Sequence, residues 1–157
     1  MPKIIAVFLF MLITIQPAFA EMAKGFTLPT DKGEVELSKL KGKVVYVDFW
    51  ASWCAPCRKS FPWMNKMHAK YESQGLEVIG ISLDEDEAKA YKFLEKIPAH
   101  FTIAYDTKGT VADLYDVQVM PTSYLIDRNG KLLFTHKGFK TKHEDAMEAE
   151  LVKALKK

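Results

Sequence analysis

Two cysteines carry the chemistry that this sequence makes available. Cys54 and Cys57 are the only cysteines in the 157 residues, and they lie three positions apart in the segment WCAPC. Two thiols at this spacing can form a disulfide and exchange it with another thiol pair. A disulfide across so short a loop removes little chain entropy, so it stabilises a fold poorly. We therefore interpret the pair as redox-active; a passive local disulfide is the alternative.

The segments on either side of the cysteines suit that chemistry. Residues 43–50, KVVYVDFW, form an apolar run with one acid, which is typical of a strand covered on both faces of a parallel sheet. A helix is expected to begin near Cys54 and to run to about Ser73, with a kink at Pro62. A thiolate at a helix N-terminus is stabilised by free N–H groups, which lowers its pKa. We expect Cys54 to be the exposed attacking sulfur and Cys57, one turn on, to resolve the mixed disulfide.

The remaining pattern predicts one α/β domain over residues 21–157. An N-terminal hairpin is expected around residues 26–37, followed after the cysteine helix by a buried strand at 76–83. Residues 84–96 predict an amphipathic helix with acids in its first turn. Its expected inner face is Ala88, Tyr91, Leu94 and Ile97. Further strands are expected at 101–105, 123–126 and 132–135, with a tight turn at Asn129-Gly130, and further helices at 110–115 and from about Lys142.

Residues 1–20 have the composition of a secretory signal peptide. Lys3 is the only charge among them, residues 4–15 are apolar apart from one threonine, and the segment ends in Ala18-Phe19-Ala20. A basic start, a short apolar core and an A-x-A ending predict export with cleavage after Ala20. The core is shorter than the roughly 20 residues that span a bilayer, and an uncleaved anchor is the alternative. We expect a periplasmic protein that contacts the membrane only if this segment is retained.

Several motifs together resemble a known family. Residues 47–57, VDFWASWCAPC, and the later Pro62 resemble the active-site segment of thioredoxins, and residues 119–122, VMPT, resemble their cis-proline loop. The N-terminal hairpin and residues 84–105 resemble the TlpA/ResA-like branch of exported thiol-disulfide oxidoreductases. The resemblance covers nearly all of residues 24–157. It implies a thioredoxin fold: a central mixed sheet with helices on both faces, an N-terminal hairpin and a helix–strand central insertion.

The resemblance also assigns a role to an acid near the cysteines. Asp48 matches the buried acid beneath the thiols of thioredoxins. Burial raises the pKa of a carboxyl group, so Asp48 could exchange a proton with Cys57. Thioredoxins often carry a lysine near this acid, where this chain has Gly80. An acid at a strand edge, satisfied by water, is the alternative.

A second implied role concerns substrate contact. Pro121 matches the cis-proline that faces the disulfide and keeps metal away from the thiols; an ordinary trans turn proline is the alternative. Met120 beside it would offer backbone groups to an extended client segment. Trp50 is interpreted as core. The residues implied to contact substrate are Trp53, Ala55, Pro56, Met120 and Pro121.

Other chemistries fit the sequence less well. A c-type haem needs a histidine directly after the second cysteine, where this chain has Arg58. No two of the four histidines are paired at the spacing of zinc ligands, and the acidic run at 84–87 lacks the glycine and the later glutamate of a calcium loop. There is no nucleotide-binding fingerprint, and 22 basic against 20 acidic residues leave no basic excess for nucleic acid. We expect no cofactor and no metal.

The sequence therefore predicts a monomeric reductase that acts on disulfides in exported client proteins. A chain without a nicotinamide site must take its electrons from another protein, and the resemblance implies a membrane thiol-disulfide electron donor and cytochrome c maturation as one pathway. Two alternatives stay open. The protein could instead oxidise or isomerise exported chains, or it could be a copper-handling module that uses its thiols, Met120 and histidines as ligands.

Overall fold

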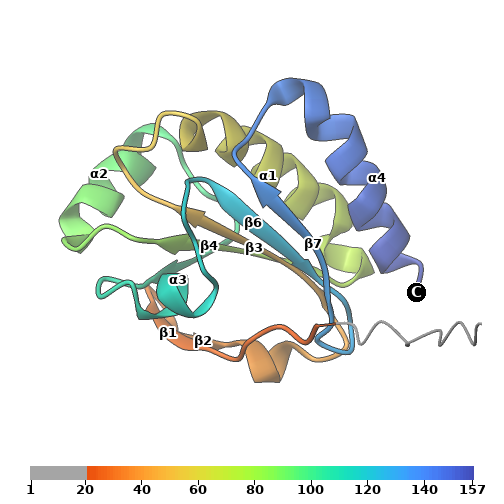
Figure 1. Cartoon of the computed structure of the whole chain (residues 1–157). Coiled ribbons are helices and arrows are strands. Elements are labelled where there is room, and N and C mark those ends of the chain that lie inside the picture. The colour runs from red at the N-terminus through yellow and green to blue at the C-terminus, as the bar shows by residue number, and fades with distance from the viewer. Residues whose placement is uncertain (1–20) are drawn as a thin grey trace, which may run out of the picture.

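A seven-stranded mixed sheet forms the centre of the fold (Figure 1). The computed structural model describes residues 21–157, and the predicted signal segment at 1–20 lies outside this range. The strand order is β2-β1-β5-β4-β3-β6-β7. The strands are β1 (Thr27–Thr30), β2 (Gly33–Glu36), β3 (Val44–Trp50), β4 (Leu76–Ser82), β5 (Thr102–Tyr105), β6 (Thr122–Ile126) and β7 (Leu132–Lys137).

Helices cover both faces of this sheet, as the sequence predicts (Figure 1). The α-helices are α1 (Cys57–Tyr71), α2 (Glu87–Lys96), α3 (Thr110–Leu114) and α4 (Glu144–Leu155). Buried side chains of α1, α2 and α4 join one apolar cluster, whereas α3 and the β1–β2 hairpin contribute to a second cluster on the opposite face. None of the helices in the described part of the chain is long and apolar enough to cross a membrane.

The strand β3 lies in the middle of the sheet and leads directly to the cysteines. All seven of its residues are buried, which confirms the prediction of a strand covered on both faces. It pairs in parallel with β4, from Val44 opposite Leu76 to Trp50 opposite Ser82. On its other side it pairs antiparallel with β6, where Phe49 lies opposite Thr122. The end of β3 and the start of β6 therefore meet at the same edge of the sheet.

Two helix predictions are wrong in detail. The helix α1 begins at Cys57 rather than near Cys54, so Cys54 lies in the turn before it. The helix α2 begins at Glu87 with Asp86 as its N-cap, so Asp84 is not in its first turn. The apolar periodicity does not mark where the first helical hydrogen bond forms. In α2 the side chain of Asp86 caps the helix by accepting the N–H of Ala88, whereas α1 has no side-chain cap.

The inner face of α2 matches the prediction only in part: Leu94 and Ile97 are partly buried and pack against the apolar cluster, as expected. Ala90 and Phe93 are buried, whereas Ala88 is exposed and Tyr91 is 42% exposed. The hydroxyl of Tyr91 donates a hydrogen bond to Asp31 at the tip of the β1–β2 hairpin, 3.1 Å away. Because tyrosine is both apolar and polar, it lies at the border of the helix and leaves the buried position to Phe93.

Candidate active site

The turn between β3 and α1 carries the two cysteines. Their sulfur atoms form a disulfide with an S–S distance of 2.02 Å. The backbone N–H of Cys54 donates to Ala51 O at 3.0 Å, which closes the turn. The backbone N–H of Cys57 donates to Cys54 O at 3.2 Å and to Cys54 Sγ at 3.3 Å. An N–H group directed at this sulfur is the arrangement that stabilises a thiolate at the start of a helix.

Cys54 is more buried than predicted, whereas Cys57 lies further inside, as expected. Cys54 is 3% exposed and Cys57 is fully buried, so the expectation of an exposed Cys54 is wrong for the disulfide form. Both side chains belong to the apolar cluster beneath α1, because the turn folds them toward the sheet. Cys54 remains the more accessible of the two. Its neighbour Trp53 is 70% exposed, and Trp50 is fully buried as expected.

Asp48 lies in the middle of β3 and is fully buried. Its Oδ1 accepts a hydrogen bond from the Ser123 hydroxyl at 2.8 Å, and Ser123 lies directly opposite on β6. Its Oδ2 has no hydrogen-bond partner among the described residues. Burial raises the pKa of Asp48 to about 7, and the single bond from Ser123 opposes that rise. A carboxyl group in this range can take up or release a proton near neutral pH.

Gly80 lies opposite Asp48 on β4, at the position where the resemblance implies a lysine in other members. A Cβ at Gly80 would be 3.1 Å from both Ile103 Cδ1 and Phe101 Cε2 and 3.2 Å from Trp50 Nε1. Such contacts are too close for a side chain to be added without displacing these groups. The space that a lysine would need is filled by apolar packing, so no cation reaches Asp48 from this position.

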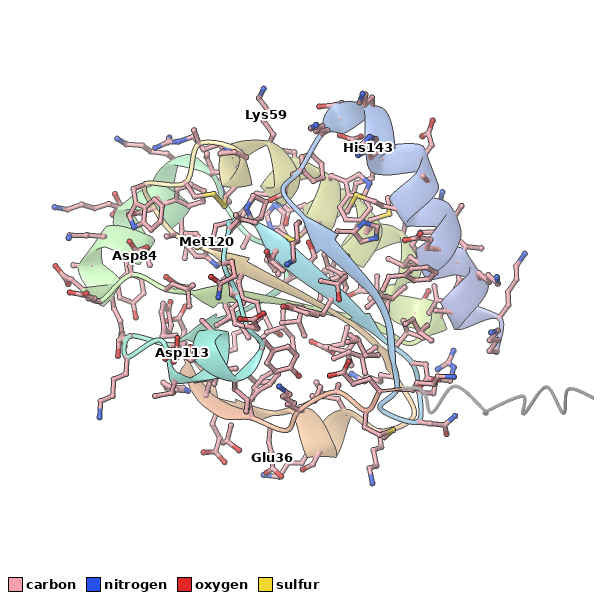
Figure 2. The ribbon with its side chains drawn as sticks, in the orientation of Figure 1. Glu36, Lys59, Asp84, Asp113, Met120 and His143 are labelled. Carbon is pink, nitrogen blue, oxygen red and sulfur yellow. A yellow bond between two sulfur atoms is a disulfide. The ribbon has the colours of Figure 1, made fainter. Side chains whose placement is uncertain are left out.

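The loop before β6 contains the proline that the sequence singles out. The Met120–Pro121 peptide bond is cis, in agreement with the resemblance. Because Phe49 lies opposite Thr122, this loop lies beside the end of β3. Met120 packs against the apolar cluster that contains both cysteines (Figure 2). Pro121 O accepts a hydrogen bond from Gly138 N–H at 2.7 Å, whereas Met120 has no backbone partner within residues 21–157.

Sequence reasoning missed two polar residues near the cysteines. Ser123 is the hydrogen-bond partner of Asp48, and Asp84 is buried with its carboxylate against Ser52 in the cysteine turn (Figure 2). The position of Asp84 held a usable signal. It comes two residues after the parallel strand β4, and the carboxyl ends of parallel strands meet at the edge where ligand and catalytic groups gather. No comparable signal identifies Ser123.

Several residues around the disulfide are exposed. A groove between the β1–β2 hairpin, α2 and residues 98–103 lies elsewhere, and neither cysteine lines it. Beside the disulfide, Trp53, Ala55, Pro56 and Val119 are exposed. Within residues 21–157, no three His, Cys, Asp or Glu side chains are grouped to hold a metal ion. Exposed apolar groups beside the disulfide suit contact with a protein partner.

Comparisons with known proteins agree with this site. The AhpC/TSA family matches residues 19–135. The thiol-disulfide oxidoreductase ResA of Bacillus thuringiensis subsp. konkukian is 38% identical over 111 residues, which are 71% of this chain but only 64% of that protein. ResA of Geobacillus kaustophilus is 34% identical over 137 residues, which are 87% of this chain and 79% of that protein.

A solved structure extends the likeness to the fold. A protein of Chlorobium tepidum with the provisional name thiol:disulfide interchange protein DsbE is 51% identical, with a TM-score of 0.85. The match covers 87% of this chain and 96% of that one. The fold is therefore the thioredoxin-type mixed sheet that the sequence predicts. Since the family match extends over most of its length, the chain belongs to the AhpC/TSA family, and ResA thiol-disulfide oxidoreductases are among its relatives.

Proposed function

We propose that this protein is an exported thiol-disulfide oxidoreductase that reduces disulfides in client proteins. The observation that carries the proposal is the Cys54–Cys57 disulfide in the turn before α1, where Cys57 N–H is directed at the Cys54 sulfur. This geometry favours Cys54 as the thiolate that attacks in the reduced protein. The names of the ResA relatives support the same chemistry.

The reaction begins on the reduced protein. The Cys54 thiolate attacks one sulfur of a client disulfide, so the Cys54–client bond forms while the client S–S bond breaks. The leaving client sulfur takes a proton from water. Cys57 then transfers its proton to Asp48 and attacks the Cys54 sulfur, which re-forms the disulfide and releases the second client sulfur. That sulfur takes up a proton, so the client gains an electron pair and two protons in each cycle.

The proposed proton acceptor is Asp48, and its environment supports this role. Its Oδ2 has no hydrogen-bond partner within residues 21–157, and with the pKa raised to about 7 its carboxyl group is close to half protonated at neutral pH. A group with a pKa near the working pH is the most effective acid or base. The oxidised protein must then be reduced again by another dithiol protein, for which we propose a membrane-bound donor.

The client is proposed to bind over the exposed residues beside the disulfide. Trp53 supplies a large exposed apolar surface, and Ala55 and Pro56 are exposed between the cysteines. The backbone groups of Met120 have no backbone partner in the described part of the chain and can pair with an extended client segment in the manner of an added strand. This mode recognises a backbone more than a sequence. Cytochrome c maturation is the pathway that the family resemblance implies for such a client.

The direction of the reaction is tested by the reduction potential of the Cys54–Cys57 pair. We would equilibrate the protein with glutathione buffers and follow the fluorescence of the tryptophans near the disulfide. A potential near or below about −220 mV is expected for a reductant. A potential near about −120 mV, as in a strong oxidant, would reverse the proposal and leave an oxidase or isomerase.

The role of each cysteine is tested by serine substitution and insulin reduction. Cys54→Ser is expected to abolish the activity, because the attacking sulfur is removed. Cys57→Ser is expected to form a mixed disulfide with insulin that persists, because nothing resolves it. Insulin reduction by Cys54→Ser at the wild-type rate would contradict the assignment of the attacking sulfur.

A further inference from the structure

Ser52, in the turn that leads to Cys54, is held through each of its polar atoms. Its backbone N–H donates to Asp84 Oδ2 at 2.8 Å, and its hydroxyl donates to Asp84 Oδ1 at 2.7 Å. Its carbonyl oxygen accepts a longer hydrogen bond from Arg58 Nη2 at 3.5 Å. A third donor, the hydroxyl of Ser82, lies 3.3 Å from Asp84 Oδ2. Both carboxylate oxygens of Asp84 therefore accept hydrogen bonds, and each accepts one from Ser52 in the cysteine turn.

Burial of the Asp84 carboxylate is energetically unfavourable, and its hydrogen bonds have to offset this cost. It is 3% exposed, and no Lys, Arg or His of residues 21–157 forms a salt bridge with it. A buried carboxylate without a cation is unfavourable unless hydrogen bonds compensate it. Here the compensating donors come from Ser52 and Ser82, so the carboxylate and the turn stabilise each other.

Ser52 lies inside the turn that Cys54 N–H closes on Ala51 O. The same turn places Cys54 Sγ 3.3 Å from the backbone N–H of Cys57. A shift of the turn would lengthen or misalign this hydrogen bond, because α1 is anchored separately by its own packing. Holding Ser52 therefore holds the hydrogen bond that favours the Cys54 thiolate.

We propose that Asp84 is a positioning residue, which fixes the cysteine turn through Ser52 and so keeps Cys57 N–H directed at the Cys54 sulfur. The inference rests on the proposed function for its purpose, since a well-stabilised thiolate makes Cys54 the attacking sulfur. The contacts to Ser52 themselves are independent of any client.

Removing the charge of Asp84 and releasing the turn that it holds should shift the pH at which the Cys54 thiolate forms in opposite directions, which makes the proposal testable. A negative charge near Cys54 disfavours its thiolate, so removing the charge alone would let the thiolate form at lower pH. Loss of the held turn weakens the hydrogen bond to the sulfur, so the thiolate would form at higher pH. The sign of the change therefore distinguishes a positioning residue from a nearby charge.

The test is the pH dependence of Cys54 alkylation by iodoacetamide in the reduced full chain. In Asp84→Asn, the amide nitrogen cannot accept the second hydrogen bond from Ser52. We expect the pH midpoint to rise by about one unit, which slows alkylation below the midpoint about tenfold. Ser52→Ala loses only the hydroxyl bond, so its midpoint should rise less. Asp86→Asn, an equal change of charge at an exposed helix cap of the same loop, should leave the rate within about twofold.

A midpoint that falls in Asp84→Asn would show an electrostatic effect alone and would overturn the proposal. An unchanged midpoint in both Asp84→Asn and Ser52→Ala would overturn it as well, even if thermal stability falls. If Asp84→Asn does not fold, Ser52→Ala decides by itself, since it retains Asp84 and the backbone bond. Alkylation needs no client, so a protein that reduces no insulin could still confirm or overturn the role of Asp84.

Discussion

Asp48 in β3 and Asp106 just after β5 are both buried acids, but their surroundings supply different numbers of hydrogen-bond donors. Asp106 follows β5 and accepts hydrogen bonds from the backbone N–H groups of Val111 and Ala112, each at 2.9 Å, on one oxygen. Its other oxygen accepts the Thr110 hydroxyl at 3.2 Å. Asp48 receives only the Ser123 hydroxyl, and its second oxygen has no partner in the described chain.

The difference follows from where each acid lies along the chain. Asp106 precedes the short helix α3, whose first N–H groups have no partner within the helix and bind the carboxylate. Asp48 lies within a strand whose backbone groups are already paired with β4 and β6, so only a side chain can reach it. Burial with enough donors makes a structural carboxylate, whereas burial with one donor leaves a group that can exchange a proton.

The largest expected effect is a pH-dependent change of stability in Asp48→Asn. The pKa of Asp48 is raised from 3.8 to about 7 in the fold, so its contribution to stability is fully present below the unfolded pKa. It is lost as the pH rises through about 7. Relative to the wild type, the variant should gain on the order of 4 kcal/mol between pH values of about 4 and about 9. Urea unfolding of the oxidised proteins measures this, and a difference that does not vary with pH would contradict it.

Asp106→Ala is expected to have a somewhat smaller effect, and it should destabilise the protein where Asp48→Asn stabilises it. The substitution leaves the N–H groups of Val111 and Ala112 without their acceptor, which should lower the free energy of unfolding by about 3 kcal/mol. Cys54 alkylation in the folded protein should not change, because no hydrogen bond within residues 21–157 joins Asp106 to the cysteine turn. Asp113→Ala, at an exposed acid of α3, is the control and should change stability little. Slowed alkylation in Asp106→Ala would show that the two regions are coupled.

The smallest expected effect is a further rise of the Asp48 pKa in Ser123→Ala. The substitution removes the one hydrogen bond that favours the charged carboxylate, so the pKa should rise by about one unit. The carbon-13 resonance of the Asp48 carboxyl group in the oxidised protein reports this value directly. Ser60→Ala is the control: the hydroxyl that it removes donates to Cys57 O and not to Asp48, so the titration of Asp48 should be preserved. An unaltered titration in Ser123→Ala would mean that burial alone sets the pKa.

Local features of the sequence were sufficient for much of the fold and for part of the site. The apolar run of β3, the N-terminal hairpin and the turn at Asn129-Gly130 each depend on neighbouring residues, and the structure confirms them. The cysteine pair is also a local feature, and its disulfide follows from a spacing of three residues. The cis bond at Pro121 was predictable only because a motif resembled a known family.

What the sequence determined by itself was the chemistry: a redox pair after a buried strand, with an acid in that strand. Only the tertiary structure decided how these groups are supported. Ser123 reaches Asp48 across 75 positions of sequence, and Ser52 reaches Asp84 across 32. The first pair depends on the register of β3 and β6, and a shift of one residue would turn one of the two side chains to the other face. The second pair depends on the parallel pairing of β3 with β4, which brings the loops after these strands together. The burial of Cys54 and of Phe93 in α2 also escaped prediction, because packing against distant elements sets both.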